Sequence, residues 1–394
     1  MANNKDKKIL NVPALRFPEF TEEWKNTTLK NECSINPTSD KLKDEFVYVD
    51  LESVEKGELT KKQVIEKENA PSRAQRVLRN GDVLFQCVRP YQRNNYLVKN
   101  VSSEVQWVAS TGYAQLRTER NNPAFIYHLL NTSSFNKKVI VRCTGSSYPA
   151  INSDDLSKIH FYICGDIEEQ KRIADFLTLL DERIATQNKI IEKLETLIKG
   201  ICNKSLYTVN GTAIQLGDIL IERRERTVIN NQYEVLSSTV KGIFSQREYF
   251  SKDIASENNV GYKIIRLHDV VLSPQNLWMG NVNYNDNFEV GIVSPSYKVF
   301  SIAENLDKRY IATLLKTHRA LYNYMLVSEQ GASIVRRNLN MEAFEQITFK
   351  IPPLSKQEKI GNAISILQAR ITSAIRIKTA YEAQKQWLLT QMFI

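Results

Sequence analysis

Two stretches of the chain carry apolar residues at alternating spacings of three and four. This heptad pattern is typical of a long helix that packs against another helix along one narrow stripe. Each helix should contain about 35 residues and extend about 50 Å, at about 1.5 Å per residue. The predicted pairing positions are Ile173, Leu177, Leu180, Ile184, Ile191 and Leu194 in the first helix and Ile360, Ile364, Leu367 and Ile371 in the second. Asp166-x-x-Glu169 and Ser355-x-x-Glu358 have the form of capping boxes at the two helix starts.

The segment before each helix predicts a mixed α/β (α+β-like) domain. Short runs rich in β-branched and aromatic residues indicate strands, and one longer amphipathic run in each domain indicates a helix. The expected strands are 46–50, 83–88, 113–118 and 158–164 in the first domain and 233–238, 270–273, 297–302 and 347–351 in the second. The internal helices should cover 123–141 and 307–327.

The chain also repeats itself once, at a constant offset of 187 residues. Asp82-Val83-Leu84 aligns with Asp269-Val270-Val271, and Gln170 aligns with Gln357. An offset of this length describes two copies of a whole domain with its helix. We therefore expect a first domain over 1–166, its helix over 167–206, a second domain over 207–353 and its helix over 354–394.

Two heptad helices in one chain most simply pair with each other, as an antiparallel coiled coil. That pairing would hold the two domains at opposite ends of a rod, related by an approximate two-fold axis. Two similar but divergent domains suggest two related targets that are read together. The organisation is therefore that of a recognition protein.

Charge favours nucleic acid as the target. The formal net charge is +9 and the pI about 9.1. Between Pro71 and Tyr148, eleven arginines and lysines face only three acidic residues. Most of these cations are arginine, whose planar fork suits phosphates and guanine edges. A further basic run, Arg223, Arg224 and Arg226, either contacts phosphate or is simply solvated.

Known catalytic motifs are missing. There is no phosphate-binding GxxxxGK[ST] loop and no (N/D)PP(Y/F) element of an adenine methyltransferase. The four histidines lack zinc-ligand spacing. Asp155, Glu169 and Lys171 resemble a nuclease D…ExK set, but the second copy does not preserve the spacing. We expect no enzyme activity and no bound metal.

The remaining composition indicates a cytoplasmic protein. The five cysteines are odd in number and widely spaced, which is typical of reduced thiols. No apolar run is long enough to cross a membrane, and the N-terminus lacks the features of a signal peptide.

Loops at matched places in both copies carry the candidate recognition residues. One pair follows the strands 83–88 and 270–273, and it interleaves arginines, amides and aromatics that could read guanine, adenine and thymine. The other pair precedes the last strand of each domain, where Gly145 and Gly331 would permit close approach to a phosphate backbone. Ordinary surface loops, and helix C-caps at the two glycines, are the alternatives. The candidate DNA-binding residues are Arg89, Tyr91, Arg93, Asn95, Arg142, Ser146, Ser147, Tyr148, Gln275, Asn276, Trp278, Asn281, Gln330, Ser333, Arg336 and Arg337.

Together these features resemble the specificity (S) subunit of Type I restriction-modification enzymes, over essentially the whole chain. The resemblance is carried by Leu15-Arg16-Phe17-Pro18-Glu19-Phe20 followed by Trp24 and Leu29, by Asn80-Gly81-Asp82-Val83-Leu84, and by the entries into the long helices at 167–174 and 352–360. One departure is His268, which replaces Gly81 in the second copy.

The resemblance implies two target-recognition domains that bind double-stranded DNA. It also implies two modification subunits, which hold S-adenosylmethionine and methylate adenine, and restriction subunits that use ATP and Mg. This chain itself would hold no cofactor. The alternative is a coiled-coil scaffold with incidental, non-specific nucleic-acid binding.

Overall fold

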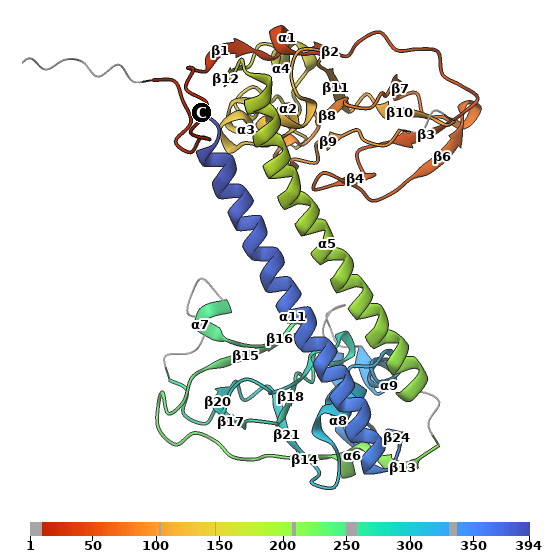
Figure 1. Cartoon of the computed structure of the whole chain (residues 1–394). Helices are drawn as coiled ribbons and strands as arrows, with labels where there is room; N and C mark the ends of the chain where they lie inside the picture. Colours follow the sequence, from red (N-terminus) through yellow and green to blue (C-terminus); the bar gives the residue numbers. More distant parts are fainter. Residues whose placement is uncertain (1–9, 102–103, 146, 207–209, 250–257, 331–336) are drawn as a thin grey trace, which may run out of the picture. The chain divides into compact units, whose positions relative to one another are not determined.

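The computed structural model describes residues 10–101, 104–145, 147–206, 210–249, 258–330 and 337–394. The chain divides into two compact units, Met1–Asn188 with Arg376–Ile394, and Lys189–Ile375. Each unit combines one α/β domain with half of each long helix, α5 (Ile167–Leu206) and α11 (Leu354–Gln391) (Figure 1).

The first unit contains two four-stranded sheets and a two-stranded one. The orders are β6-β3-β10-β7, β2-β11-β8-β9 and β1-β12, and among the described strands of this unit only β3 and β10 pair in parallel. A short hairpin, β4-β5, completes the set. The strands are β1 (Lys25–Thr28), β2 (Ser34–Ile35), β3 (Glu45–Val49), β4 (Val54–Glu55), β5 (Glu58–Leu59), β6 (Gln63–Glu66), β7 (Ala74–Val77), β8 (Val83–Gln86), β9 (Tyr96–Leu97), β10 (Gln106–Ser110), β11 (Tyr113–Arg117) and β12 (His160–Ile163).

The internal helix predicted over 123–141 is two helices. α2 (Pro123–Leu130) and α3 (Ser133–Ile140) are separated because the Thr132 side chain accepts a hydrogen bond from the Phe135 amide and starts a new helix. The amphipathic pattern continues across this cap, which is why the sequence suggested one helix. The shorter helices are α1 (Leu29–Glu32) and α4 (Ser153–Ser157), with 3-10 turns η1 (Lys67–Asn69) and η2 (Pro90–Gln92).

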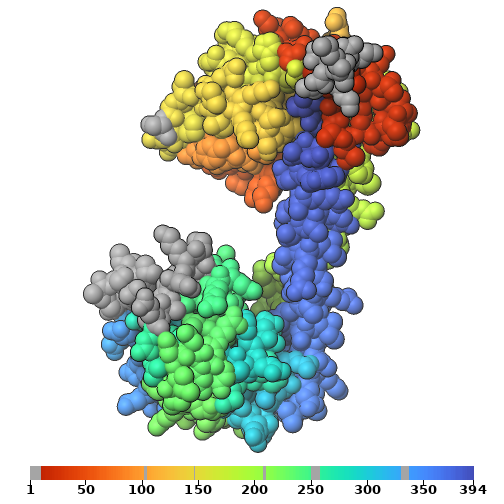
Figure 2. Space-filling model, turned by 90° about the vertical axis from the view of Figure 1, so that its left-hand side faces the viewer, coloured from red at the N-terminus to blue at the C-terminus, as the bar shows by residue number. Residues whose placement is uncertain are grey.

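The core of the first unit is completed by both long helices. Ile173 and Leu177 from the start of α5 are buried with Trp24 and Phe125. From the other end of the chain, Phe393 joins the same cluster, with its ring centroid 6.0 Å from that of Trp24 and 5.2 Å from that of Phe125. Figure 2 shows the end of α11 lying against the N-terminal residues of this unit, where the Leu15 amide donates to the Gln391 carbonyl.

The second unit repeats this plan with shorter sheets. The orders are β14-β21-β18-β19, β13-β24, β15-β16, β17-β20 and β22-β23, all antiparallel. The strands are β13 (Thr212–Gln215), β14 (Leu220–Glu222), β15 (Leu236–Thr239), β16 (Gly242–Ser245), β17 (Lys263–Arg266), β18 (Val270–Leu272), β19 (Val282–Tyr284), β20 (Val290–Val293), β21 (Lys298–Ile302), β22 (Ser328–Gln330), β23 (Arg337–Leu339) and β24 (Thr348–Ile351).

The predicted helix over 307–327 is also a pair, α8 (Lys308–Leu315) and α9 (His318–Leu326), and Thr317 caps the second. The core again takes residues from both long helices. Leu206, the last residue of α5, is buried in one cluster with Ile360 and Ile364 from the start of α11. The remaining elements are α6 (Leu216–Ile219), α7 (Gln246–Tyr249), α10 (Met341–Glu345) and η3 (Leu277–Met279).

An equivalent glutamine fastens each long helix to its domain. The buried Gln170 side chain accepts a hydrogen bond from the Asn122 amide at 2.8 Å and donates to the Cys164 carbonyl at 2.9 Å. Gln357 accepts from the Asp307 amide at 3.0 Å and donates to the Pro352 carbonyl at 2.8 Å. In both domains one side chain therefore joins the start of the long helix to the N-cap of the internal helix.

The predicted pairing positions are unevenly buried. Ile173, Leu177 and Leu180 are buried in the first unit, as are Ile360 and Ile364 in the second. The middle positions are half-buried, because the ends pack into a domain core and the middle does not. These half-buried residues are Ile184, Ile191, Leu194, Leu367 and Ile371.

The helices run antiparallel where they meet in the first unit. Asp181 of α5 forms an ion pair with Lys385 of α11. Leu180, next to Asp181, and Leu388, close to Lys385, are buried in the same cluster. The start of α5 therefore lies along the end of α11.

The capping boxes are only partly present. Asp166 caps α5 by accepting hydrogen bonds from the amides of Glu168 and Glu169, at 2.7 and 3.3 Å. The Glu169 side chain does not return to Asp166, because it binds Arg16 instead. α11 begins at Leu354, so Ser355 already lies inside the first turn and is not the cap. The Pro353 carbonyl there accepts hydrogen bonds from the Lys356 and Gln357 amides.

The compact units do not follow the expected four-part division, in which the helices stand apart from the domains. Both unit boundaries fall inside the long helices, between Asn188 and Lys189 and between Ile375 and Arg376. The reason is that the ends of each helix supply core residues to a domain.

Because Phe393 fills the core of the first unit, we expect Phe393→Ala to lower the free energy of unfolding of that unit by about 3–5 kcal/mol. Trp387→Ala is the matched control, since Trp387 is a large exposed aromatic near the end of α11, six residues before Phe393. Its effect should stay within about 0.5 kcal/mol. Urea unfolding measures the free energy of unfolding of both variants, and hydrogen exchange locates the part of the protein that loses stability. Equal stability of the two variants would contradict this description of the core.

Candidate nucleic-acid interface

Each domain places two loops side by side that are far apart in sequence. We call residues 87–95 and 273–281 the strand loops, because they follow β8 and β18. Residues 141–150 and 327–340 are the helix loops, because they follow α3 and α9. The strand loops carry η2 and η3, which contact α3 and α9 in their respective domains. All sixteen candidate DNA-binding residues lie in these four loops.

The first strand loop is bent by two arginines in the left-handed conformation. Arg89 and Arg93 flank η2 with φ of 54° and 55°. This conformation is costly for residues other than glycine, and it persists only where the surrounding structure holds it. The loop is held from within by Gln86, whose side chain accepts from the Asn94 amide at 3.0 Å and donates to the Gln92 side chain at 2.9 Å.

The first strand loop is joined to the first helix loop at Arg89. The Arg89 amide donates to the Pro149 carbonyl at 2.8 Å. The Arg89 guanidinium carbon lies 4.4 Å from the centroid of the Tyr148 ring, which is the geometry of a cation–π contact. Tyr148 is 64% exposed, so this stack forms at the protein surface.

The second pair of loops is joined in the same way with the roles exchanged. Here the helix loop supplies the arginine and the strand loop the aromatic, since the Arg337 guanidinium carbon lies 4.6 Å from the Trp278 ring centroid. The Arg337 amide also donates to the Gln275 carbonyl at 3.1 Å. Each domain therefore has one arginine–aromatic stack and one backbone hydrogen bond between its two loops.

The side chains of two candidate residues are buried. Asn95 is 1% exposed, and its side chain accepts from the Gln86 amide and donates to the Asn131 side chain. Asn281 is 5% exposed, and its amide accepts from the Ser238 hydroxyl and donates to the Ser238 carbonyl. Both side chains hold the loops from inside in this structure, and a direct contact of either residue with DNA stays a prediction.

Other candidates reach the surface. Tyr91 is 55% exposed, and Gln275, Arg142 and Ser147 are exposed as well, although Arg142 donates to the Lys138 carbonyl. Arg93 is half-buried and reaches the Asn131 carbonyl and Ser133 hydroxyl at 3.4 Å each. Asn276 is half-buried. Ser146, Ser333 and Arg336, together with the Gln330 side chain, lie outside the described residues.

Gly145 is not a helix C-cap. α3 ends at Ile140, and Val141 occupies the cap position. Gly145 lies further along the helix loop with φ of 90°, and a Cβ there would approach the Tyr148 carbonyl oxygen to 3.0 Å. Glycine is therefore required for the bend that brings Tyr148 back over Arg89. Gly331 falls outside the described residues.

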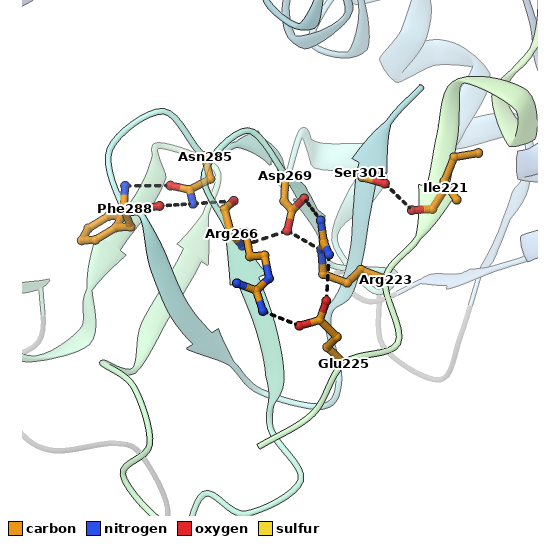
Figure 3. Close-up of polar contacts among 8 residues, drawn as sticks. All are labelled: Ile221, Arg223, Glu225, Arg266, Asp269, Asn285, Phe288 and Ser301. Carbon is orange, nitrogen blue, oxygen red and sulfur yellow. Dashed lines mark hydrogen bonds and ion pairs between the residues drawn. The ribbon is translucent and has the colours of Figure 1, made fainter. Parts of the chain in front are cut away.

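An equivalent aspartate lies in the turn that precedes β8 and in the turn that precedes β18, and it organises that turn. Asp82 is buried and accepts two hydrogen bonds from Arg117, at 2.7 and 2.8 Å. Asp269 is bound in the same bidentate way by Arg223, at 2.8 and 2.9 Å (Figure 3). Fork-to-fork pairs of this kind fix geometry as well as charge. Each hydrogen bond to the guanidinium raises the pKa of the arginine.

Replacement of Gly81 by His268 leaves this turn intact. His268 keeps a positive φ of 74°, close to the 89° of Gly81. Its ring stacks on Tyr284, and its Nδ1 lies 2.6 Å from the Tyr284 hydroxyl. The Asn285 side chain braces the turn by bonding the Arg266 carbonyl and both backbone groups of Phe288 (Figure 3).

Several cations that were candidates for DNA contact are bound within the protein. Arg117 and Arg223 pair with the two aspartates, and the Arg223 side chain remains only 23% accessible. Arg76 donates to the Tyr113 carbonyl, and Arg79 pairs with Asp40. The exposed cations of the 71–148 segment are Arg73, Arg79, Lys99, Arg120, Lys137 and Arg142. The charge of this segment is therefore only partly available to a ligand.

Two members of the nuclease-like set, Glu169 and Asp155, are hydrogen-bonded to other residues of the chain. Glu169 is buried and accepts hydrogen bonds from Arg16, at 2.7 and 2.8 Å, and from Trp24 at 3.3 Å. This contact explains why Arg16 and Trp24 occur in the motif near the N-terminus. Asp155 is bound instead by Asn152, within α4. Among the described residues, no three His, Cys, Asp or Glu side chains gather in a way that could hold a metal ion.

The cysteines offer no reactive thiolate at neutral pH. Burial raises the pKa of Cys33 to about 12 and that of Cys87 to about 11. Burial also raises the pKa of Cys143, Cys164 and Cys202. Nucleophilic chemistry requires the thiolate, and burial disfavours that form at all five positions.

Sequence reasoning missed Gln86, Asn131 and Ser238, which hold the strand loops from behind. Gln86 gave a signal, because it is a polar residue inside the apolar run of β8. Asn131 and Ser238 gave none, since their partners lie 36 and 43 residues away in sequence.

Within the described ranges, none of the helices combines the length and apolar character needed to span a bilayer.

Comparison with known proteins identifies the class to which these paired domains belong. The family model for the Type I restriction modification DNA specificity domain matches the chain twice, over residues 22–196 and 214–380. The two matches cover most of the chain, and each takes in one domain and part of the long helix that follows it. The chain belongs to this family.

Individual relatives agree with this assignment. The specificity subunit of the Type I restriction enzyme HindI of Haemophilus influenzae is 25% identical over 168 residues, which are 42% of this chain. The match spans only about a third (33%) of that relative's length.

Two solved structures share the fold. The S subunit of a Type-I restriction-modification system from M. genitalium aligns with a TM-score of 0.62 and 13% identity, covering 97% of this chain and 99% of the other. A chain from a structure of complex assembly in a type I R-M system gives a TM-score of 0.50 and 19% identity, covering 93% and 96%.

Removing Asp269 should leave the Arg223 guanidinium half-buried without its main partner. We expect Asp269→Asn to lower the free energy of unfolding of the second unit by about 3 kcal/mol. Glu225→Gln is the control, because Glu225 binds the same arginine from a more exposed position (42% of its side chain is accessible). Its cost should be below about 1 kcal/mol. Chemical denaturation distinguishes the two, and a smaller loss for Asp269→Asn than for Glu225→Gln would contradict the assigned role.

Proposed function

We propose that this chain is the DNA specificity subunit of a Type I restriction-modification complex and reads a bipartite target, one half-site per domain. The observation that carries the proposal is the duplicated loop pair. Both domains build the same junction of strand loop and helix loop, and they place different side chains on it. One scaffold with two sets of surface residues is what two different half-sites require. Family membership agrees with it.

The exposed and half-buried side chains of these loops have the chemistry to read bases. An arginine fork binds the O6 and N7 atoms of guanine, and glutamine or asparagine binds adenine. Aromatic side chains pack beside thymine methyl groups or distorted base steps. Arg89 and Tyr91 in the first domain, and Gln275, Trp278 and Arg337 in the second, are our assignments for these roles.

We further infer that this chain does no chemistry itself and acts in the cytoplasm with partner subunits. Two modification subunits would bring S-adenosylmethionine and methylate adenine, and restriction subunits would use ATP and Mg. The buried state of Glu169 and the unreactive thiols support a recognition role. The paired long helices supply a surface outside the two domains on which such subunits could assemble.

Methylation mapping tests the proposal. The chain is co-expressed with modification subunits encoded beside it, and methylated adenines are located across the host genome. We expect one motif of two short half-sites separated by a fixed number of unread bases. A coiled-coil scaffold with incidental binding would instead give no motif, and its DNA binding would be unselective and steeply dependent on salt. A single uninterrupted target would also contradict the proposal.

The long helices should set the gap between the half-sites. Inserting one heptad into each helix, after Asn188 and after Ile375, preserves the apolar stripe and lengthens both helices equally. Seven residues add about 10 Å, which corresponds to about three base pairs of duplex. We expect the number of unread bases to change while both half-sites stay the same. An altered half-site, or an unaltered gap, in the methylation map would show that the helices do not act as the spacer.

A further inference from the structure

The two loop junctions are built from the same kind of contact, with the contributing loops exchanged. Arg89 and Trp278 belong to the strand loops, whereas Tyr148 and Arg337 belong to the helix loops. The repeat therefore does not preserve a residue at either position. What the two domains share is a guanidinium stacked on an aromatic ring at the junction, next to a backbone hydrogen bond that closes the loops.

The stack leaves the hydrogen-bonding edge of the guanidinium in a defined plane. The contact with the ring does not use the N–H donors, which lie in the plane of the guanidinium. In Arg337 the Nε donor is itself buried, so the two terminal nitrogens are the ones that would bind a base. An arginine side chain is otherwise long and freely rotating, and holding its plane is the requirement for a two-pronged hydrogen bond. The stacking partner can therefore fix the orientation of a base-reading fork without touching the base itself.

The surrounding loop is built to hold these groups. Arg89 is kept in the left-handed conformation, with its amide bound to the Pro149 carbonyl, and Gly145 permits the bend that carries Tyr148. In the second domain β22 and β23 pair so that Arg337 emerges at the end of a strand, where its amide meets the Gln275 carbonyl. Both arginines are thus set on backbone that is fixed by a partner loop.

We propose that Arg89 and Arg337 each read a guanine, one in each half-site, and that Tyr148 and Trp278 are positioning residues that hold the two forks in plane. This inference rests on the proposed function and assigns the specificity-determining group in each domain. The bidentate contact of arginine with guanine is the match that a planar fork of this kind makes in the major groove.

The test maps methylated motifs for the whole complex, with the parent chain and single variants. Arg89→Ala and Arg89→Lys should each relax one guanine position of the first half-site, with discrimination falling about 10- to 100-fold. Tyr148→Ala should relax the same position, whereas Tyr148→Phe, which keeps the ring, should retain the parent motif. The second half-site should be unchanged in all four variants and serves as the internal control.

The second domain gives an independent set of variants. Arg337→Ala, Arg337→Lys and Trp278→Ala should relax one guanine position of the second half-site only, and Trp278→Phe should preserve it. Tyr322→Ala, which removes an exposed aromatic of α9 outside both loops, should leave the motif as in the parent. Melting temperatures of the purified complexes show whether each variant is folded, and persistence of the untouched half-site shows that the complex remains active.

Each outcome decides the proposal. A parent motif with no guanine in either half-site would overturn it, and so would aromatic-to-alanine variants that keep the parent motif. Arginine variants that weaken methylation of all sequences equally would identify phosphate contacts and overturn it as well. Loss of the motif in Tyr148→Phe would assign the role to the hydroxyl instead of the ring. Absence of any motif in the parent complex would instead contradict the proposed function itself.

Discussion

The burial of the helix ends in the domain cores is the constraint on which the rest of the structure depends. Neither domain completes its core from its own contiguous segment. The first needs Ile173 and Leu177 from α5 and Phe393 from beyond the end of α11, and the second needs Leu206 and Ile364. Apolar burial on this scale supplies most of the driving force for folding. Each long helix is therefore part of two cores and is fixed at both of its ends.

This arrangement explains how far the sequence could predict the fold. The heptad pattern located both helices, because apolar residues at spacings of three and four are a local signal. It could not show that Ile173 belongs to the same core cluster as Trp24, since a core position and a helix-pairing position have the same apolar character. The break at Thr132 was missed for a related reason, because a side chain that caps a new helix interrupts the backbone without interrupting the amphipathic pattern.

The sequence indicated where a recognition site is expected, and the structure shows how the loops there are built. Matched loops in two copies indicated four segments that the structure joins in pairs, but the pattern could not tell which side chains turn inward. Asn95 turns toward Asn131, and Arg223 toward Asp269, because of partners that lie 36 and 46 residues away. Polar residues in a loop have the same local signal whether they face solvent or brace the backbone, and only the tertiary structure separates the two cases.

The two domains differ in a way that follows from this division between inward and outward residues. Two inward polar groups occur at equivalent positions in both copies, Gln170 with Gln357 and Asp82 with Asp269. Each pair makes the same kind of contact, although the arginines that bind the two aspartates come from different positions. Outward groups differ, and even the arginine and its aromatic partner are exchanged between loops. A buried polar group that loses its partner destabilises the fold. At the surface, by contrast, either loop can supply the arginine and the other loop the aromatic residue. The fold therefore keeps these two supports constant, while the residues on the loop surface vary independently in each domain.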